Sequence, residues 1–576
     1  MCTDKYLKDD GVFGFLITQA AFKTKGSGEL FRRFKLGNKM NLKVIEAHDL
    51  VEILPFEGAN NRTAAIILKK GEETEYPIKY TLWRKLYDID QKESLNTASK
   101  KLHEIEMMAI PSDPDNELSP WITVPPNVVE IVKRVYGKNA YPAYAGIYSG
   151  GANGVYWVRI RGIINESKKV IEIPNSLKSV LGIENEIVVR ELLVENVTEG
   201  MKKKIRKVET VIEDFFIYPL LKSKNVKKWR TVGYNYAIQM HDPIKRIGYD
   251  EGWVKVNFPK TYAYLRGFEK ELKERKSGVV RQLLAKGPFY TMYSVGEYTY
   301  SPYKVVWNRM GGKISSCVVS KIKDEYLGEK LVLPENVLAF IPTDDEDEAH
   351  YICAIMNSSI TDMVLRAIAG GTKSFGTPKI IEDTIRIPKF DNNNEIHRKI
   401  SELSNEAHKL ARDGKDVSSI EEETDGLVAE LYGISKEEME KVKRTISIQE
   451  GEIPEEEEIE EEEVKEENPS VAFMNTVLEP EKPGEIEVIV TNPSRELLEL
   501  AIEILDEKHI FKVTDVEKTF KVGIKPLEIG EYEIKYKIIS PKEELSNTIT
   551  LYVKTQKKHR KSRLAKKFDD LLEDEG

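Results

Sequence analysis

The chain opens with an apolar stretch. Residues 12–22 read VFGFLITQAAF, a continuous apolar run of the kind that is buried on both faces of a parallel sheet. The following GSGELFRRFKL predicts a turn and an amphipathic helix, with Leu30, Phe31 and Phe34 on one face. A strand inside a parallel sheet needs neighbours on both sides, and only a few residues precede this one. The pattern therefore predicts that the chain begins partway through a fold.

Strand and helix signals alternate up to about residue 90. NLKVIEAHDL (41–50) and RTAAIILKK (62–70) predict two further strands. This alternation is typical of an α/β fold. Residues 91–120 are polar, predict helix and end in the Pro-rich IPSDPDNELSPW, so we interpret them as a linker.

The remaining chain divides into parts with different patterns. These are a mixed, aromatic-rich α+β domain (121–390), a helical segment (391–447), an acidic linker (448–468), an immunoglobulin-like β-sandwich (469–555) and a charged tail (556–576). The sandwich is predicted from short alternating strands separated by Pro and Gly turns.

The net charge of −9 is unevenly distributed. Residues 451–468 hold eleven Glu and one Lys, so subtracting this local −10 leaves the other residues at +1. From residue 201 to 230, ten Lys and Arg face three acidic residues. A near-neutral body with a basic segment can bind a polyanion such as DNA.

Cysteine and histidine usage indicates neither disulfides nor a metal centre. Cys2, Cys317 and Cys353 show no CxxC spacing, and the eight His are scattered without metal-ligand spacing. The apolar runs are too short to span a bilayer, and no secretory signal opens the chain. We therefore expect a cytoplasmic protein without a metal site.

A series of short motifs then runs in order through the first ninety residues. They read DDGVFGFLITQAAF, GSGELFRRF, VIEAHDL, LPFEGANNRT and AAIILKKG. This order resembles the second half of a class I, AdoMet-dependent DNA adenine methyltransferase. The resemblance implies that residues 1–90 form the C-terminal half of such a catalytic domain.

Three later segments extend the resemblance to about residue 435. FFIYPLLKSKNVKKWR (215–230), GTKSFGTPKIIEDTIRIPKF (371–390) and ETDGLVAELYGIS (423–435) are similar to segments of restriction–modification methyltransferases that carry their own target recognition domain. The resemblance implies a type IIG-like enzyme, with residues 121–390 as the DNA specificity domain.

Two motifs of the family are not found in this sequence. One is the Gly-rich AdoMet loop of the D-P-A-C-G-S-G type, and the other is the [N/D/S]-P-P-[Y/F] motif, which binds the amino group of the flipped adenine and stacks on the base. VPPN (124–127) lacks both the polar first residue and the aromatic last one. We therefore predict no catalytic residue in this chain.

By resemblance, the loop before the third strand would meet the target base. Phe56 in LPFEGANNRT lies where the family stacks an aromatic ring on the flipped adenine, although a loop Phe can equally pack on the sheet. Asn61 and Arg62 are candidate contacts to the DNA backbone.

Three further segments carry candidate DNA contacts, each with a purely structural alternative. AYAGIYSGGANGVYWVRI combines Gly, which permits close approach, with side chains that read base edges. The basic segment 222–230 and the loop GTKSFGTPK (371–379) suit contacts to the DNA backbone. The candidates are Tyr148, Asn153, Trp157 and Arg159; Lys222, Lys224, Lys227, Lys228, Trp229 and Arg230; and Lys373, Ser374 and Thr377.

Together these patterns predict the C-terminal portion of a site-specific adenine DNA methyltransferase. AdoMet would be the cofactor and double-stranded DNA the partner, and a separate N-terminal methyltransferase subunit could complete the sheet. Alone, the chain would be inactive. The alternatives are a DNA-binding specificity module without methyl transfer and a multi-domain protein that binds other proteins.

Overall fold

The computed structural model places most of the chain. It describes residues 7–26, 28–36, 40–53, 56, 62–89, 95–113, 115–183, 186–199, 205–368, 375–452, 470–474, 477–492, 497–505, 507–514, 517–539 and 544–553. The chain divides into two compact units, residues 1–455 and 456–576. The division lies inside the stretch predicted as an acidic linker. The individual domain limits within each unit stay predictions.

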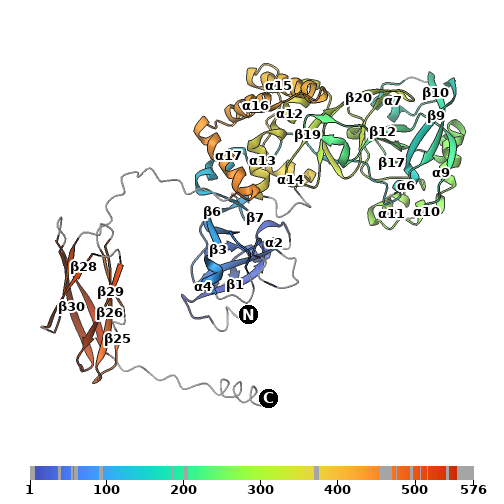
Figure 1. Cartoon of the computed structure of the whole chain (residues 1–576). Coiled ribbons are helices and arrows are strands. Elements are labelled where there is room, and N and C mark those ends of the chain that lie inside the picture. The colour runs from blue at the N-terminus through green and yellow to red at the C-terminus, as the bar shows by residue number, and fades with distance from the viewer. Residues whose placement is uncertain are drawn as a thin grey trace, which may run out of the picture. The chain divides into compact units, whose positions relative to one another are not determined.

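A seven-stranded sheet is the first element of the larger unit (Figure 1). Its strands follow the order β1 (Val12–Thr18), β4 (Thr63–Lys70), β3 (Met40–Asp49), β5 (Ile78–Lys85), β6 (Leu102–Asp113) and β7 (Asn116–Val124), and β2 (Lys35–Leu36) pairs with β3. Only the β3–β5 pair is parallel among those in the sheet that have printed registers. The short helices are α2 (Ala20–Lys23), α3 (Glu29–Arg32) and α4 (Leu95–Ser99). Trp121 stacks on Phe22 in the core, with ring centroids 4.5 Å apart.

The position predicted for the opening strand is wrong. β1 is an edge strand of the described sheet and runs antiparallel to β4, rather than lying inside a parallel sheet. Because nothing in the described part of the chain covers it, Phe15 and Leu16 each remain 51% exposed although they point to opposite faces.

The amphipathic helix and the linker predicted next are also wrong. α3 has only four residues and leaves Leu30 83% exposed, while Phe34, with φ 43°, already lies beyond the helix and is buried. Residues 102–120, expected to be a helical linker, form β6 and most of β7. Ile105, Met107 and Ala109 occupy alternate positions and face the core, which is the periodicity of a strand. The many polar residues around them made the segment resemble a polar helix.

A six-stranded sheet organises the region after residue 140. Its order is β11 (Glu209–Glu213), β10 (Glu186–Asn196), β9 (Trp157–Val170), β15 (Asn235–Ile238), β12 (Ile217–Leu221) and β22 (Leu333–Pro334). A second, four-stranded sheet contains β19 (Ser316–Val319), β18 (Tyr303–Asn308), β23 (Leu338–Thr343) and β8 (Tyr144–Ala145). Hairpins are formed by β13 (Val226–Lys227) with β14 (Arg230–Thr231), β16 (His241–Asp242) with β17 (Ile247–Gly248), and β20 (Lys321–Asp324) with β21 (Gly328–Leu331).

Short helices pack around these sheets. They are α5 (Val129–Val135), α6 (Asn153–Tyr156), α7 (Asn175–Leu181), α8 (Glu251–Asn257), α9 (Pro259–Arg266), α10 (Glu269–Lys273) and α11 (Gly278–Leu284), with 3₁₀ turns at Pro126–Val128, Ser223–Asn225 and Glu297–Tyr300. Asp250 caps α8 by accepting a hydrogen bond from the backbone N–H of Trp253, which satisfies a donor that the first turn leaves open.

The helices that follow carry the segment predicted as helical. They are α12 (Glu346–Asn357), α13 (Ser359–Ile368), α14 (Pro378–Thr384), α15 (Glu395–Arg412), α16 (Ser418–Leu431) and α17 (Lys436–Glu450). Ser435 and Glu438 form a capping box at the start of α17. In Figure 1, α12, α15 and α16 lie side by side. Their apolar faces share one core with the four-stranded sheet, so this prediction of helices is confirmed.

The smaller unit is all β in its described residues. One sheet holds β24 (Ser470–Met474), β26 (Gly484–Thr491) and β29 (Glu517–Ile524); the other holds β25 (Val477–Leu478), β31 (Glu544–Val553), β30 (Gly530–Ile539), β27 (Leu498–Ile504) and β28 (Glu507–Val513). Residues from both sheets, such as Val488 and Ile502, share a single core. The predicted two-sheet character is confirmed. Residues 453–469 and 554–576, with most of the predicted acidic linker and the whole tail, lie outside the described residues.

Within the part of the chain that the structure describes, no helix combines the length and the apolar character needed to cross a membrane.

Candidate nucleic-acid interface

Polar side chains gather at one edge of the first sheet, where β3 ends. Asp49 is 5% exposed and receives hydrogen bonds from Gln19 Nε2 (2.5 Å) and from Tyr80 OH (2.9 Å). Its other carboxylate oxygen accepts a bond from the backbone N–H of Val51 at 3.1 Å. A buried carboxylate that accepts several hydrogen bonds is well compensated for its lost hydration.

Lys23 lies next to this carboxylate and connects the sheet to the helices. Its Nζ donates to Thr123 Oγ1 at 2.7 Å and to the carbonyl oxygen of Ala367, at the end of α13, at 2.8 Å. Burial lowers the pKa of Lys23 to about 7, and the charge of Asp49 opposes this shift. We call Gln19, Lys23, Asp49 and Tyr80 the edge cluster.

The candidate base-stacking residue comes seven residues after Asp49 in the chain. Phe56 is 50% exposed, so its ring is accessible, and its role stays a prediction. Arg62 is exposed, and its carbonyl oxygen accepts the backbone N–H of Gln19 at 2.9 Å. Asn61 lies outside the described residues.

The second group of polar side chains forms where two parallel strands end. β12 and β22 are paired in parallel, with Leu221 opposite Pro334. The next residues, Lys222 and Glu335, therefore leave the sheet at the same edge, and the backbone N–H of Glu335 donates to Leu221 O at 2.9 Å. The carboxyl ends of parallel strands are common places for ligand sites.

Two of the predicted segments meet at this edge. The Lys222 ammonium lies 3.7 Å from the centre of the Trp157 ring, a cation–π contact. Glu335 Oε1 accepts a hydrogen bond from Asn153 Nδ2 at 3.4 Å. Lys222 is half-buried, which lowers its pKa, and the negative charge of Glu335 opposes that shift. We call Asn153, Trp157, Lys222 and Glu335 the recognition cluster. The prediction that Trp157 contacts DNA is wrong, because its ring is 7% exposed and packs in a hydrophobic core, where it supports Lys222.

The Gly-rich loop is shaped to reach this position. A side chain at Gly146 would collide with the carbonyl oxygens of Pro334 and Glu335, so glycine permits the close approach of the two backbones. Gly150 has φ 73°, a left-handed conformation that favours glycine. The buried Arg275 donates from its guanidinium to the Ser149 carbonyl oxygen at 2.9 Å and fixes the loop.

Two further candidates lie beside the recognition cluster. Arg159 on β9 is partly exposed and forms ion pairs with Glu195 (3.3 Å) and Glu199 (2.8 Å). Tyr148 is half-buried and its backbone pairs with that of Tyr293. Both residues border the cluster without belonging to it.

A short series of contacts connects the cluster to the third predicted segment. Arg309 donates to the carbonyl oxygen of Asn336 at 2.6 Å, next to Glu335. The backbone N–H of Gly376 donates to Arg309 O at 3.0 Å, and Trp307 Nε1 donates to Gly376 O at 2.9 Å. Thr377 follows and is half-buried at the start of α14, while Lys373 and Ser374 lie outside the described residues.

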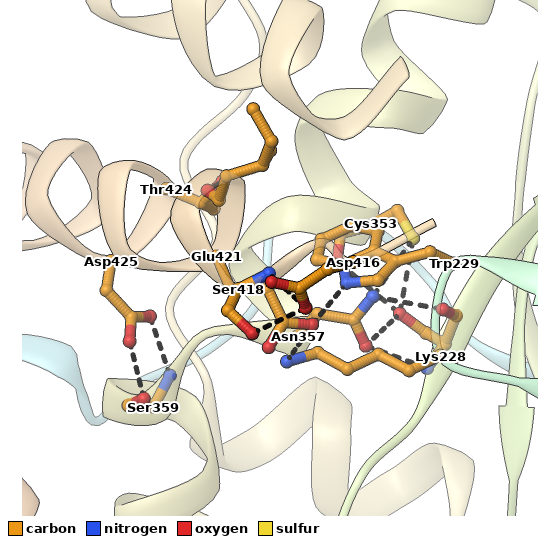
Figure 2. Close-up of polar contacts among 12 residues, drawn as sticks. Lys228, Trp229, Cys353, Asn357, Ser359, Asp416, Ser418, Glu421, Thr424 and Asp425 are labelled. Carbon is orange, nitrogen blue, oxygen red and sulfur yellow. Dashed lines mark hydrogen bonds and ion pairs between the residues drawn. The ribbon is translucent and has the colours of Figure 1, made fainter. Parts of the chain in front are cut away.

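The end of the basic segment 222–230 contacts the helices α15 and α16, and Figure 2 shows Lys228 and Trp229 from this segment. Trp229 is 1% exposed and donates from Nε1 to Glu421 on α16 at 2.6 Å, and Lys228 pairs with the same carboxylate at 2.8 Å. Arg230, although exposed, donates to the carbonyl oxygen of Ala411 on α15 at 3.1 Å. The prediction that Trp229 contacts DNA is wrong, because its side chain is buried in the core shared with the helices. Lys224 and Lys227 are exposed and stay candidates.

Sequence patterns did not identify Glu335, Arg309 or Lys23. Glu335 occurs in LVLPENV, where nothing distinguishes it from a turn residue. Its neighbours in the cluster come from positions more than a hundred residues away, so only the parallel pairing of β12 and β22 brings them together.

The described residues offer binding groups and no metal centre. No group of three or more His, Cys, Asp and Glu in the described part of the chain is placed to hold a metal ion. The recognition cluster combines a half-buried ammonium and amide with a buried carboxylate, and Phe56 is an exposed aromatic ring elsewhere in the same unit. Ammonium and amide groups are of the kind that contact phosphates and base edges.

Two relatives identified by sequence are methyltransferases. The type II methyltransferase M.NspV from Nostoc sp. is 28% identical over 149 residues, which cover 26% of this chain and 29% of the relative. The type II methyltransferase M.MjaIV from Methanocaldococcus jannaschii is 24% identical over 225 residues, which cover 38% of this chain and 68% of the relative. The chain thus spans less than a third of the first relative and about two thirds of the second. No protein-family model matches the chain.

Solved structures give weaker similarities. The type IIL restriction–modification enzyme MmeI, solved in complex with DNA, shares 11% identity and a TM-score of 0.41 over 76% of this chain and 49% of its own. The type IIG restriction endonuclease BpuSI shares 12% identity and a TM-score of 0.23, over 74% and 47% of the two chains. A CARDB domain from Pyrococcus furiosus, solved with two metal ions, shares 17% identity and a TM-score of 0.13 over 15% of this chain and 92% of its own. The predicted resemblance to restriction–modification methyltransferases is confirmed by the relatives, and their similarity supports a function related to DNA methyltransferases.

Proposed function

We propose that this chain is the DNA-recognising, C-terminal portion of a site-specific adenine methyltransferase. The observation that carries the proposal is the series of contacts that joins separate predicted DNA-contact segments. The loop containing Asn153, the strand end at Lys222 and the turn before Thr377 are connected through Glu335 and Arg309. This surface would bind duplex DNA, while Phe56 would stack on the adenine extruded from the duplex.

Methyl transfer would require elements that this sequence does not contain. AdoMet is the expected cofactor, and its Gly-rich loop and the [N/D/S]-P-P-[Y/F] motif would come from another polypeptide or region. β1 supports this proposal, because an edge strand that is apolar and half-exposed on both faces is suited to continue a sheet covered on both sides. A separate N-terminal methyltransferase subunit pairing along β1 would satisfy this strand. The cytoplasm stays the predicted location.

Binding and methylation assays on the full chain test the proposal. We expect the purified chain to bind mixed-sequence duplex DNA, with an affinity that falls steeply as salt rises. Alone it should transfer little or no methyl group from radiolabelled AdoMet. Addition of the polypeptide encoded upstream of its gene should restore transfer to the adenine amino nitrogen. Absence of duplex binding at low salt would refute the proposal.

A second candidate function is a specificity module without catalysis. The chemistry of the recognition cluster favours it, because an amide, an ammonium and a carboxylate are groups that contact DNA without reacting with it. In this case the chain would bind duplex DNA as described, but no upstream polypeptide would restore methyl transfer. The same pair of assays therefore separates the two functions.

A further inference from the structure

Glu335 is a buried acid with few compensating contacts. It is 7% exposed, and among the described residues its carboxylate accepts one side-chain hydrogen bond, the long one from Asn153. The second oxygen, Oε2, has no hydrogen-bond partner in the described part of the chain. A buried carboxylate normally has several donors or a close cation. Here the nearest cation, Lys222, lies on the Trp157 ring instead.

The backbone that carries this carboxylate is held in place by hydrogen bonds. The backbone of Glu335 is held on both sides, because its N–H donates to Leu221 O at 2.9 Å and its carbonyl oxygen accepts from Leu338 N at 2.8 Å. The neighbouring Asn336 N–H donates to Ile147 O at 3.0 Å. An acceptor held in this way loses little conformational freedom when it binds a donor.

Asn153 is oriented by its own contacts. The Ser149 hydroxyl donates to Asn153 Oδ1, so the amide directs its Nδ2 to Glu335. Ser149 is in turn held by Arg275 through its carbonyl oxygen at 2.9 Å. The Asn153 amide therefore occupies one carboxylate oxygen and leaves the other for an external donor.

The chemistry of this external donor follows from its surroundings. Lys222 interacts electrostatically with Lys224 and Arg159, and Arg159 is already paired with Glu195 and Glu199. Lys222 and Lys224 are therefore the cations offered to an anion here, yet the unsatisfied group is an acceptor. DNA combines both properties, because phosphates are anionic and base edges carry amino donors. Among the base contacts in the major groove, a carboxylate suits the N4 amino group of cytosine.

We propose that Glu335 reads a cytosine in the recognised DNA sequence by accepting a hydrogen bond from the N4 amino group. Asn153 orients the carboxylate, and Lys222 binds a neighbouring phosphate. This inference rests on the proposed function as a DNA-recognising chain, and it adds a residue and a base to it.

Selection of duplexes with a randomised core tests the inference on the full chain. The Glu335→Gln variant keeps the shape and the Asn153 contact but replaces one acceptor by a donor. The matched control is Glu209→Gln on β11, the opposite edge strand of the same sheet, where the side chain is exposed and the same charge is removed. Melting curves followed by circular dichroism establish that both variants fold.

We expect the wild-type chain to enrich a sequence with cytosine at one position. E335Q should lower the preference for that cytosine by about ten-fold and shift it towards adenine, which Gln reads through N6 and N7. The control E209Q should keep the full preference and the wild-type affinity for non-specific duplex at low salt.

The outcomes separate this inference from the proposed function. If the wild-type chain binds duplex DNA but E335Q selects the same sequence as wild type, or if no cytosine is enriched, the inference fails and the DNA-binding function stands. If the wild-type chain does not bind duplex DNA at low salt, both fail.

Discussion

Asp49 and Glu335 occupy comparable places in two sheets and differ in how they are compensated. Each lies at the carboxyl end of a strand that has a parallel neighbour, β3 beside β5 and β22 beside β12. Both are nearly buried, at 5% and 7% exposure. Asp49 receives bonds from two side chains and a backbone N–H, whereas Glu335 receives one long bond and its pKa is raised to about 7, mainly by burial.

This difference separates an acid that stabilises the fold from one whose burial destabilises it. A compensated carboxylate contributes to stability, because its removal leaves its donors unpaired. A poorly compensated one lowers stability and is retained where binding needs it. We expect the two acids to respond differently to substitution and to pH, as follows.

Replacing Asp49 should destabilise the larger unit strongly. Asp49→Ala leaves the buried Gln19 amide and the Tyr80 hydroxyl without their acceptor, and we expect a loss of about 3 kcal/mol. Urea unfolding of the full chain, followed by circular dichroism, measures it. Tyr80→Phe is the control and should cost about 1 kcal/mol, because it removes a single donor. A loss for Asp49→Ala as small as that of the control would show that the edge cluster is not compensated as described.

Replacing Glu335 should have the opposite sign. Its folded-state pKa is raised from 4.5 to about 7, so the folded state holds the proton more tightly and stability is lost as pH rises through that interval. At pH about 8, E335Q should therefore be more stable than wild type, by about 2 kcal/mol. At pH about 4 the two proteins should be nearly equal, because both side chains are then neutral.

Unfolding of both proteins at the two pH values measures this difference. Because wild type and variant are compared at each pH, the other titrating groups cancel. A destabilised E335Q at the higher pH would mean that Glu335 is a structural residue like Asp49.

DNA sequence preference should depend on pH through the same group. In the proposed complex the carboxylate accepts a hydrogen bond from the cytosine amino group, and the groups that interact with it in the chain are Lys222 and the Asn153 amide. As pH falls through about 7 the carboxyl becomes protonated, so preference for the cytosine should decrease several-fold between pH 8 and 6. Competition between the selected duplex and one altered at that position measures it. E335Q should show no such dependence; if it titrates as wild type does, another group is responsible.

Two lysines of segment 222–230 should differ in how much they contribute to DNA binding and to its salt dependence, and this is the smallest of the expected effects. Lys224 is exposed, whereas Lys228 pairs with Glu421 at 2.8 Å. Lys224→Ala should weaken duplex binding a few-fold and reduce the slope of log affinity against log salt by about 0.9. Lys228→Ala should leave that slope unchanged. Equal effects would mean that the Lys228–Glu421 pair opens when DNA binds.

Local patterns predicted the elements whose signal in the sequence is local. The helices between 391 and 447 have an apolar periodicity, and Asn394 and Ser435 cap two of them, so the helices are visible in the sequence although packing against the four-stranded sheet stabilises them. The strands of the smaller unit alternate regularly and were predicted for the same reason. The family resemblance also came from sequence alone, since ordered motifs survive in the chain whatever surrounds them.

Pairing between distant strands decided the rest. The place of β1 at a sheet edge, the incorporation of residues 102–120 into that sheet and the burial of Trp229 depend on which segments lie beside them, and a strand or an aromatic residue looks the same in either setting. Glu335 became a candidate only because β12 and β22 run in parallel and end together. Sequence patterns indicate which residues are suited to DNA contact and to each element. The compensation of a buried charge depends on the fold, because its donors come from far along the chain.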